Sequence, residues 1–142
     1  RGWLQNASLK NAVKAVQVGA VPSSTVSNVV LKNLTVSSML QEGIQLYKTS
    51  NCIIQDCSIT DCNGGGIKVD QSTRDVVVGN TLTNLPTTAI YVNGSNNCTI
   101  KGWLSFPTRR VSFCHILRTR WPLTGSSRAL AERNLMATSR SR

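Results

Sequence analysis

The chain has 142 residues and a formal net charge of +10, and this length suits a single domain. None of its apolar runs is long enough to cross a membrane, so no membrane partner is expected. Residues 1–103 carry eight basic and five acidic side chains, a net +3, whereas residues 104–142 carry eight arginines and one acid, a net +7. The basic total is therefore mostly a property of the C-terminal segment, and it gives no reason to expect nucleic acid as a partner of the rest.

From its start the chain consists of similar segments. SNVVLKNLTV from Ser27, SNCIIQDCSI from Ser50, TRDVVVGNTL from Thr73 and NNCTIKGW from Asn96 follow one another at an interval of 23 residues. Positions that share one place in the repeat form apolar columns, namely Leu31, Ile54, Val77 and Ile100; Val36, Ile59 and Leu82; Ile44, Ile67 and Ile90; and Leu46, Val69 and Val92.

An earlier, longer copy precedes these segments. In WLQNASL, Leu4 and Leu9 keep the five-residue spacing of Leu31 and Val36. Val16 and Val18 then match Ile44 and Leu46 if one residue is missing in between, and the extra length falls in VGAVPSS at residues 18–24, which suits a loop.

Each copy holds about three short alternating runs separated by turn residues, which is the pattern of β-strands. A period in the twenties built from such strands indicates a solenoid, whose coils bury their apolar face by stacking on one another. We predict an all-β parallel β-helix of about four to five coils over residues 1–103, cut from a longer solenoid. The flanking coils of the intact protein are then expected partners.

Three consecutive glycines, Gly64 to Gly66, have a structural interpretation. Gly66 shares its column with Gly43, Ala89 and Ala15, all small, which indicates a close backbone approach before the strand IKV. A phosphate-binding loop is excluded because no Gly-Lys-Ser/Thr follows and no helix pattern begins.

The repeat I-x-x-N-x-I, followed by a small residue and I-x-V, resembles the right-handed parallel β-helix repeats of the pectin-lyase-like superfamily. VVGNTL at residues 77–82 fits it best, while Ala7, Leu34, Cys57 and Trp103 replace the Asn. The resemblance implies a right-handed helix in an extracellular or cell-surface protein. It implies a carbohydrate-active protein, a lyase or hydrolase acting on or binding acidic polysaccharide, or alternatively a non-catalytic surface or adhesin-like repeat module.

The candidate substrate-binding residues are Gln45, Lys68 and Tyr91, preceded by Gln17 in the same column. Each lies between two apolar residues of a strand and should point outward, where amide, ammonium and aromatic groups in a row could hold an acidic sugar chain. The alternative is an ordinary solvated sheet face. A second outward column, Thr35, Ser58 and Thr81, is of the kind that simply fits a sheet.

No catalytic residue can be assigned. Asp56, Asp61, Asp70 and Asp75 occupy different places in the coil, where turn chemistry explains them better than catalysis or calcium binding. Motifs of polygalacturonase, pectate lyase and epimerase type are absent, and the one histidine, His115, lies outside the repeats. Arg74 beside Asp75 offers at most a weak lyase-type pair.

No metal or other cofactor is expected, since no Cys-x-x-Cys occurs. Cys52 and Cys98 share a column but lie two coils apart, too far for a disulfide. A Cys57–Cys62 bridge remains open, although the cysteines are better explained as small buried apolar groups. Asn-x-Ser/Thr triplets begin at Asn6, Asn33, Asn93 and Asn97.

The C-terminal segment, residues 104–142, loses the repeat, replaces Lys by Arg and nearly lacks Asn. An unpatterned, disordered or out-of-frame tail explains this abrupt change better than an Arg-rich nucleic-acid or membrane segment. Residues 126–137 could form one short helix, with Ser127 as its N-cap.

Overall fold

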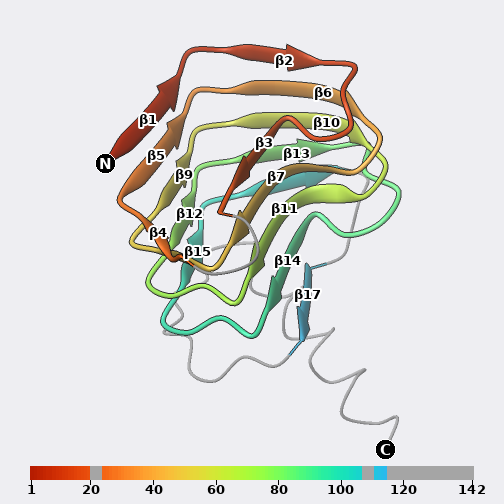
Figure 1. Cartoon of the computed structure of the whole chain (residues 1–142). Coiled ribbons are helices and arrows are strands. Elements are labelled where there is room, and N and C mark those ends of the chain that lie inside the picture. Colours follow the sequence, from red (N-terminus) through yellow and green to blue (C-terminus); the bar gives the residue numbers. More distant parts are fainter. Residues whose placement is uncertain (20–23, 107–110, 115–142) are drawn as a thin grey trace, which may run out of the picture.

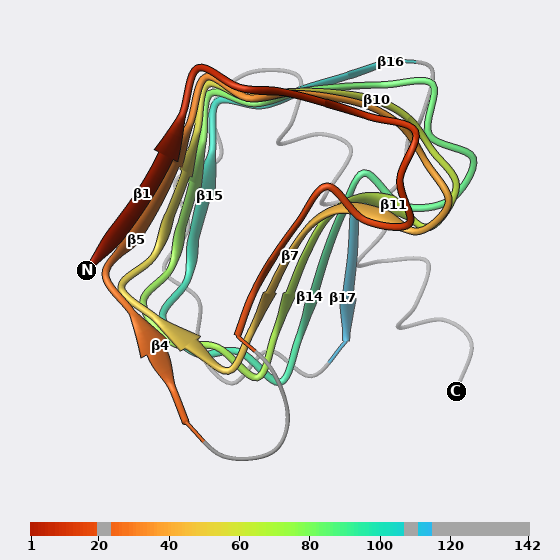
Figure 2. The same ribbon diagram turned by 45° about the horizontal axis from the view of Figure 1, so that its top comes forward.

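In the computed structural model, which describes residues 1–19, 24–106 and 111–114, the chain winds into stacked coils. Every regular element among these residues is a strand, and every strand pairing is parallel. Figure 1 shows the coils following one another from the N-terminal end, and Figure 2 shows strands of successive coils lying over one another. The predicted parallel β-solenoid is confirmed.

Three five-stranded sheets form the walls of the solenoid. The first sheet consists, in order, of β1 (Gly2–Gln5), β5 (Val29–Lys32), β9 (Ile53–Gln55), β12 (Val76–Val78) and β15 (Thr99–Lys101). The second consists of β2 (Ser8–Lys10), β6 (Thr35–Met39), β10 (Ser58–Cys62), β13 (Thr81–Thr83) and β16 (Leu104–Phe106). The third consists of β3 (Val16–Val18), β7 (Glu42–Tyr47), β11 (Gly65–Asp70), β14 (Ile90–Asn93) and β17 (Val111–Cys114). A short pair, β4 (Val26–Ser27) and β8 (Thr49–Ser50), closes one corner.

The strand register follows the apolar columns. Leu31 pairs with Ile54, Val36 with Ile59 and Ile44 with Ile67, each stacked directly on its repeat partner. These side chains are at most 2 % exposed, because alternate residues of every strand point into the coil. The longer first copy is confirmed as well, since its apolar residues join the same columns: Leu4 pairs with Leu31, Leu9 with Val36, Val16 with Ile44 and Val18 with Leu46.

Left-handed residues mark the corners of each coil. One corner column is Asn28, Asn51, Arg74 and Asn97, whose φ angles lie between 54° and 59°. Three further columns with positive φ are Asn6, Asn33, Asp56, Gly79 and Gly102; Asn11, Ser38, Asp61 and Asn84; and Lys48, Gln71 and Gly94. Asn, Asp and Gly tolerate this conformation, which explains why they separate the strands. The turn interpretation of Asp56 and Asp61 is confirmed.

Asp75 requires a correction, because it lies inside the solenoid instead of at an exposed turn. It is 0 % exposed, and it stands in the inward column between Cys52 and Cys98. Its carboxylate accepts hydrogen bonds from the backbone N–H of Cys52, at 2.8 Å, and from the hydroxyl of Thr49. Arg74 is exposed, so the two side chains do not form the pair considered as a lyase-type base.

The Asn of the repeat has a similar inward role. Asn80 is 1 % exposed; its Oδ1 accepts from Cys57 N–H at 2.9 Å, and its Nδ2 donates to the Ile54 carbonyl at 3.2 Å. In other coils this place is filled by buried Leu34, Cys57 and Trp103. An amide and an apolar side chain are thus interchangeable here, provided that the amide is hydrogen-bonded.

At each of the three glycines of the turn at residues 64–66, atoms of the neighbouring coil leave no room for a Cβ. A Cβ on Gly66 would lie 2.6 Å from the Ala89 carbonyl oxygen, as its column predicted. The positive φ, +116°, belongs instead to Gly65, where a Cβ would lie 2.6 Å from the Thr88 carbonyl oxygen. The small-residue requirement is therefore wider than the single position predicted from the sequence.

The four cysteines whose side chains are described are free and buried: Cys52, Cys57, Cys62 and Cys98. The Cys57–Cys62 bridge is therefore not formed. Burial raises the pKa of the Cys98 thiol to about 11, so the thiol stays protonated. These cysteines fill the core as small apolar groups.

The sheets extend beyond the predicted end of the repeats at residue 103. β16 and β17 pair with β13 and β14, which is possible because parallel backbone pairing does not itself depend on the apolar pattern. The remainder of the predicted tail, including the short helix expected at residues 126–137, lies outside the described residues. The division into residues 1–103 and 104–142 remains a prediction.

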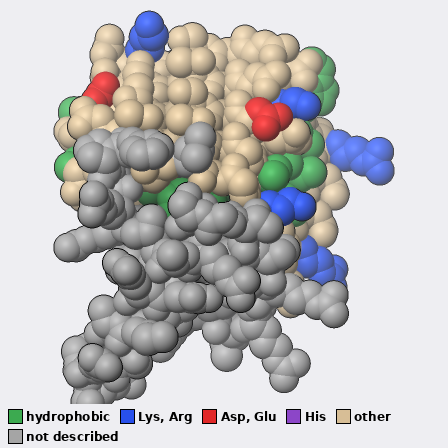
Figure 3. Space-filling model, turned by 180° about the vertical axis from the view of Figure 1, so that it is seen from behind, with side chains coloured by type: hydrophobic (Ala, Val, Ile, Leu, Met, Phe, Trp, Pro, Cys, Tyr) green, Lys and Arg blue, Asp and Glu red, His purple; other side chains and the backbone are tan. Residues whose placement is uncertain are grey.

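Most of the described surface seen from behind belongs to uncharged polar side chains and backbone (Figure 3). Within the described part of the chain, no helix is long and apolar enough to cross a membrane.

Candidate functional site

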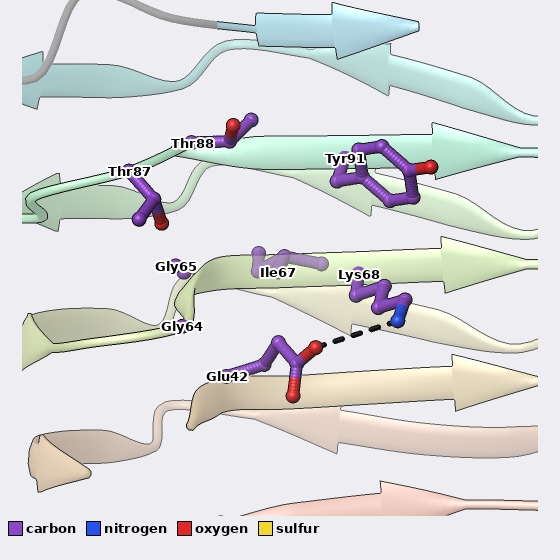
Figure 4. A pocket seen from close by; sticks show the side chains of 9 residues that line it. Glu42, Gly64, Gly65, Ile67, Lys68, Thr87, Thr88 and Tyr91 are labelled. Carbon is purple, nitrogen blue, oxygen red and sulfur yellow. Dashed lines mark ion pairs between the residues drawn. The ribbon is translucent and has the colours of Figure 1, made fainter. Parts of the chain in front are cut away.

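A hollow of about 250 Å³ opens on the outer face of the third sheet. The glycine turn at residues 64–66 forms one part of its wall, and Glu42, Lys68, Thr87, Thr88 and Tyr91 line the rest. Figure 4 shows these side chains on three successive coils: Glu42 projects from β7, Lys68 from β11 and Tyr91 from β14, and Thr87 and Thr88 lie in the turn before β14. We call this feature the Glu42 hollow. It exists because glycine removes side-chain bulk at the start of β11 while its neighbours carry long side chains.

Two lysines share the carboxylate of Glu42. Lys68 Nζ lies 3.4 Å from Glu42 Oε1, and Lys14 Nζ lies 3.6 Å from Glu42 Oε2. Burial alone would raise the pKa of Glu42, but a hydrogen bond from its own backbone and the charges of Lys14 and Lys68 outweigh burial and lower the pKa below 4.5. Glu42 is therefore ionised at neutral pH, and the three side chains together carry one net positive charge.

Lys68 also faces an aromatic ring. Its Nζ lies 5.8 Å from the centroid of the Tyr91 ring, within the range of a cation–π contact. Its side chain is 28 % exposed, so the ammonium remains reachable from solvent while it is held between carboxylate and ring. A second lysine, Lys48, stands at the corner that follows β7; its Nζ lies 5.5 Å from the centroid of the Tyr47 ring, and it does not line the hollow.

The predicted outward column is confirmed in its geometry. Gln17 pairs with Gln45, Gln45 with Lys68, and Lys68 with Tyr91. Lys68 and Tyr91 line the Glu42 hollow, but Gln45 does not. Gln45 is only 7 % exposed, and the ammonium of Lys14 donates to its Oε1. Its amide oxygen is thus already engaged, while the assignment of the three residues to substrate binding stays a prediction.

Sequence reasoning missed Glu42 and Lys14. Both stand in the column directly before the small-residue column, which runs through Lys14, Glu42, Gly65 and Thr88. The signal was available, because two opposite charges in adjacent coils at one repeat position must lie close together. It was overlooked because this column changes residue type in every coil.

The chemistry of the hollow favours binding of an anion beside a flat ring. The lysines can attract a carboxylate, and the Tyr91 ring can lie against the apolar face of a sugar. Among the described residues that line the hollow, Glu42 is the one carboxylate. No group of three or more His, Cys, Asp or Glu side chains in the described part of the chain is placed to hold a metal ion.

Comparison with known families decides the classification. The family described as the right handed beta helix region matches residues 6–104. The chain belongs to the right-handed β-helix family. This assignment confirms the predicted handedness, and membership of the pectin-lyase-like superfamily is consistent with it.

Other comparisons add no functional information about this β-helix. No curated protein matches it. Among solved structures, it is similar to trypsin-treated QnrB1 R167E, described as a plasmid-mediated fluoroquinolone resistance protein, with 9 % identity, 92 % of this chain and 98 % of that chain covered and a TM-score of 0.17. A likeness of that size carries no argument about fold or function.

Proposed function

We propose that this β-helix binds an acidic polysaccharide through the Glu42 hollow and the adjoining column of the third sheet, as part of an extracellular or cell-surface carbohydrate-active protein. The observation that carries the proposal is the position of Lys68, whose ammonium lies between the Glu42 carboxylate and the Tyr91 ring. A uronate carboxylate could pair with Lys68 while its sugar ring lies against Tyr91. Glu42 would then keep its second partner, Lys14.

A non-catalytic surface or adhesin-like module is the second candidate. It is favoured by the single carboxylate of the hollow, because hydrolysis of glycosides by protein side chains ordinarily uses a pair of carboxyl groups. Glu42 is moreover ionised, which suits an acceptor or base and not a general acid. We therefore propose, first, that the β-helix binds the polysaccharide. That it also cleaves it, as a lyase or hydrolase, is a second and more specific part of the proposal.

Titration calorimetry with oligogalacturonate at about 0.15 M salt tests the proposal, since long-range attraction by exposed charges is screened there. Lys68→Ala and Tyr91→Ala should each weaken binding by roughly tenfold, or about 1.4 kcal/mol, the size of a lost charge-assisted or aromatic contact. Glu42→Gln should instead strengthen it, because that variant removes the carboxylate that competes for Lys68.

The matched control is Lys48→Ala, which removes one positive charge from the corner that follows β7, outside the hollow. It should leave affinity nearly unchanged. Equal weakening by Lys48→Ala and Lys68→Ala would show general attraction of a polyanion to a basic protein, and would refute a site at the hollow. A neutral oligosaccharide of the same length should bind much more weakly than oligogalacturonate. No binding of either ligand would favour the surface-module candidate.

A further inference from the structure

Asparagine is followed by glycine twice in the chain, at Asn63–Gly64 and at Asn93–Gly94. In such a pair the backbone nitrogen of the glycine can attack the side-chain carbonyl carbon of the asparagine, because glycine has no Cβ that shields its nitrogen or restricts its backbone. The attack closes a five-membered succinimide ring and is the first step of spontaneous deamidation. The fold places the two pairs in different surroundings.

Asn63 and Gly64 form the exposed turn that joins β10 to β11. The side-chain amide of Asn63 has no hydrogen-bond partner among the described residues. The Gly64 N–H donates to the Gln41 carbonyl at 3.2 Å, which is at the long end of the range for such bonds. The Asn63 N–H, which donates to the Met39 carbonyl at 2.9 Å, takes no part in the attack. Ring closure at Asn63 therefore requires the loss of one long hydrogen bond.

Asn93 is held more firmly, as the last residue of β14, which pairs with β11. Its Nδ2 donates to Asp70 Oδ1 at 2.9 Å, and its backbone carbonyl accepts from the Gln71 N–H and from the Ser95 hydroxyl, both at 2.9 Å. Ring closure here requires rotation of the Asn93 side chain and of the peptide that joins it to Gly94. That rotation breaks all three bonds, one of which is made to a carboxylate.

We propose that Asn63 is a site of spontaneous deamidation and that this modification alters the Glu42 hollow. The Gly64 nitrogen forms a bond to Asn63 Cγ, and ammonia leaves with the side-chain nitrogen and the proton of the Gly64 N–H. Water then adds to either carbonyl of the ring. Opening at one carbonyl gives aspartate, and opening at the other gives isoaspartate, whose backbone runs through the former side chain and is one methylene longer.

The turn has no space for a longer backbone. A Cβ on Gly64 would lie 2.7 Å from both the Gln41 carbonyl carbon and the Glu42 nitrogen. Figure 4 shows Gly64 and Gly65 at the end of the hollow where β11 begins, so isoaspartate displaces this part of the wall. Either product also adds a carboxylate directly before Gly64, which lines the hollow, and this charge opposes the binding of an anion. The loss of anion binding rests on the proposed function, whereas the deamidation itself does not.

Peptide mass spectrometry of the full chain, aged in mildly alkaline buffer, tests the proposal. Trypsin separates the two pairs, since residues 49–68 and 75–101 form different peptides. In the folded chain Asn63 should deamidate at least about tenfold faster than Asn93, because Asn93 must first release the Asp70 carboxylate. In concentrated urea the two pairs should react at similar rates. Labelling by isoaspartyl methyltransferase identifies the isoaspartate product.

Asn63→Gln is the matched control, because its longer side chain would have to close a six-membered ring, which forms much more slowly. On ageing, the wild-type chain should lose affinity for oligogalacturonate by roughly tenfold, the loss expected for Lys68→Ala, whereas Asn63→Gln should keep its affinity.

The proposal is overturned if Asn93 deamidates as fast as Asn63 in the folded chain, or if Asn63 stays intact there while the chain in urea reacts. Equal affinities of fresh and aged wild-type chains would overturn the effect on the hollow. If the fresh chain does not bind oligogalacturonate, the proposed function fails, and the ratio of the two deamidated peptides by itself decides whether Asn63 is the modified residue.

Discussion

Arg74 occupies a corner at which the adjacent coils carry asparagine. Its φ of +59° lies in the left-handed region, as do those of Asn51 and Asn97. Its backbone N–H donates to the Asn96 carbonyl at 2.9 Å, so the stacked coils hold it in this conformation. A side chain other than Gly, Asn or Asp costs about 1–2 kcal/mol there, because its Cβ crowds the carbonyl oxygen. Arg74→Asn should therefore increase the free energy of unfolding by about 1 kcal/mol and raise Tm by about 4 °C.

Urea unfolding followed by far-UV circular dichroism measures the change. Arg74→Ala is the control, because it removes the same charge but keeps a Cβ in the left-handed conformation, and it should leave the unfolding midpoint almost unchanged. If Arg74→Ala stabilises the protein as much as Arg74→Asn, the gain comes from lost charge repulsion and not from the backbone. If neither variant gains stability, the corner imposes no conformational cost, and the reasoning fails.

Two other substitutions probe the interior. Gly66→Ala places a Cβ 2.6 Å from both the Ala89 carbonyl oxygen and a Leu82 methyl group, so it should destabilise the protein by about 1–3 kcal/mol in urea unfolding. Gly2→Ala, where the nearest atom lies 3.9 Å away, should not, and equal effects would contradict the close-approach argument. Burial raises the pKa of Asp75 above its ordinary 3.8, so its stabilising contribution is complete below pH 3.8 and declines as pH rises through the folded-state pKa. Asp75→Asn should abolish that decline in unfolding free energies measured from pH 3 to pH 8, and an unaltered pH profile would refute it.

The sequence by itself determined how the strands of successive coils stack on one another. Stacked coils must place apolar side chains above one another wherever they face inward, so the columns through Ile54, Ile59 and Ile67 fixed the strand register without coordinates. The same periodicity placed Gln45, Lys68 and Tyr91 side by side. It also put Asp75 between Cys52 and Cys98, a sign of its inward position that turn chemistry obscured.

The tertiary structure alone decided which outward residues are available. Gln45 looked open because it alternates with apolar residues, but Lys14 reaches across from the longer first coil and covers it. The Glu42 hollow likewise depends on the width of the glycine turn and on how far Lys68 extends toward Glu42. A polar group without a hydrogen-bond partner is costly in the core, so the residue types allowed at inward positions are restricted. The sequence repeat shows this restriction directly. Outward side chains have many permitted orientations in water, so their contacts follow from the geometry of neighbouring turns and not from their place in the repeat.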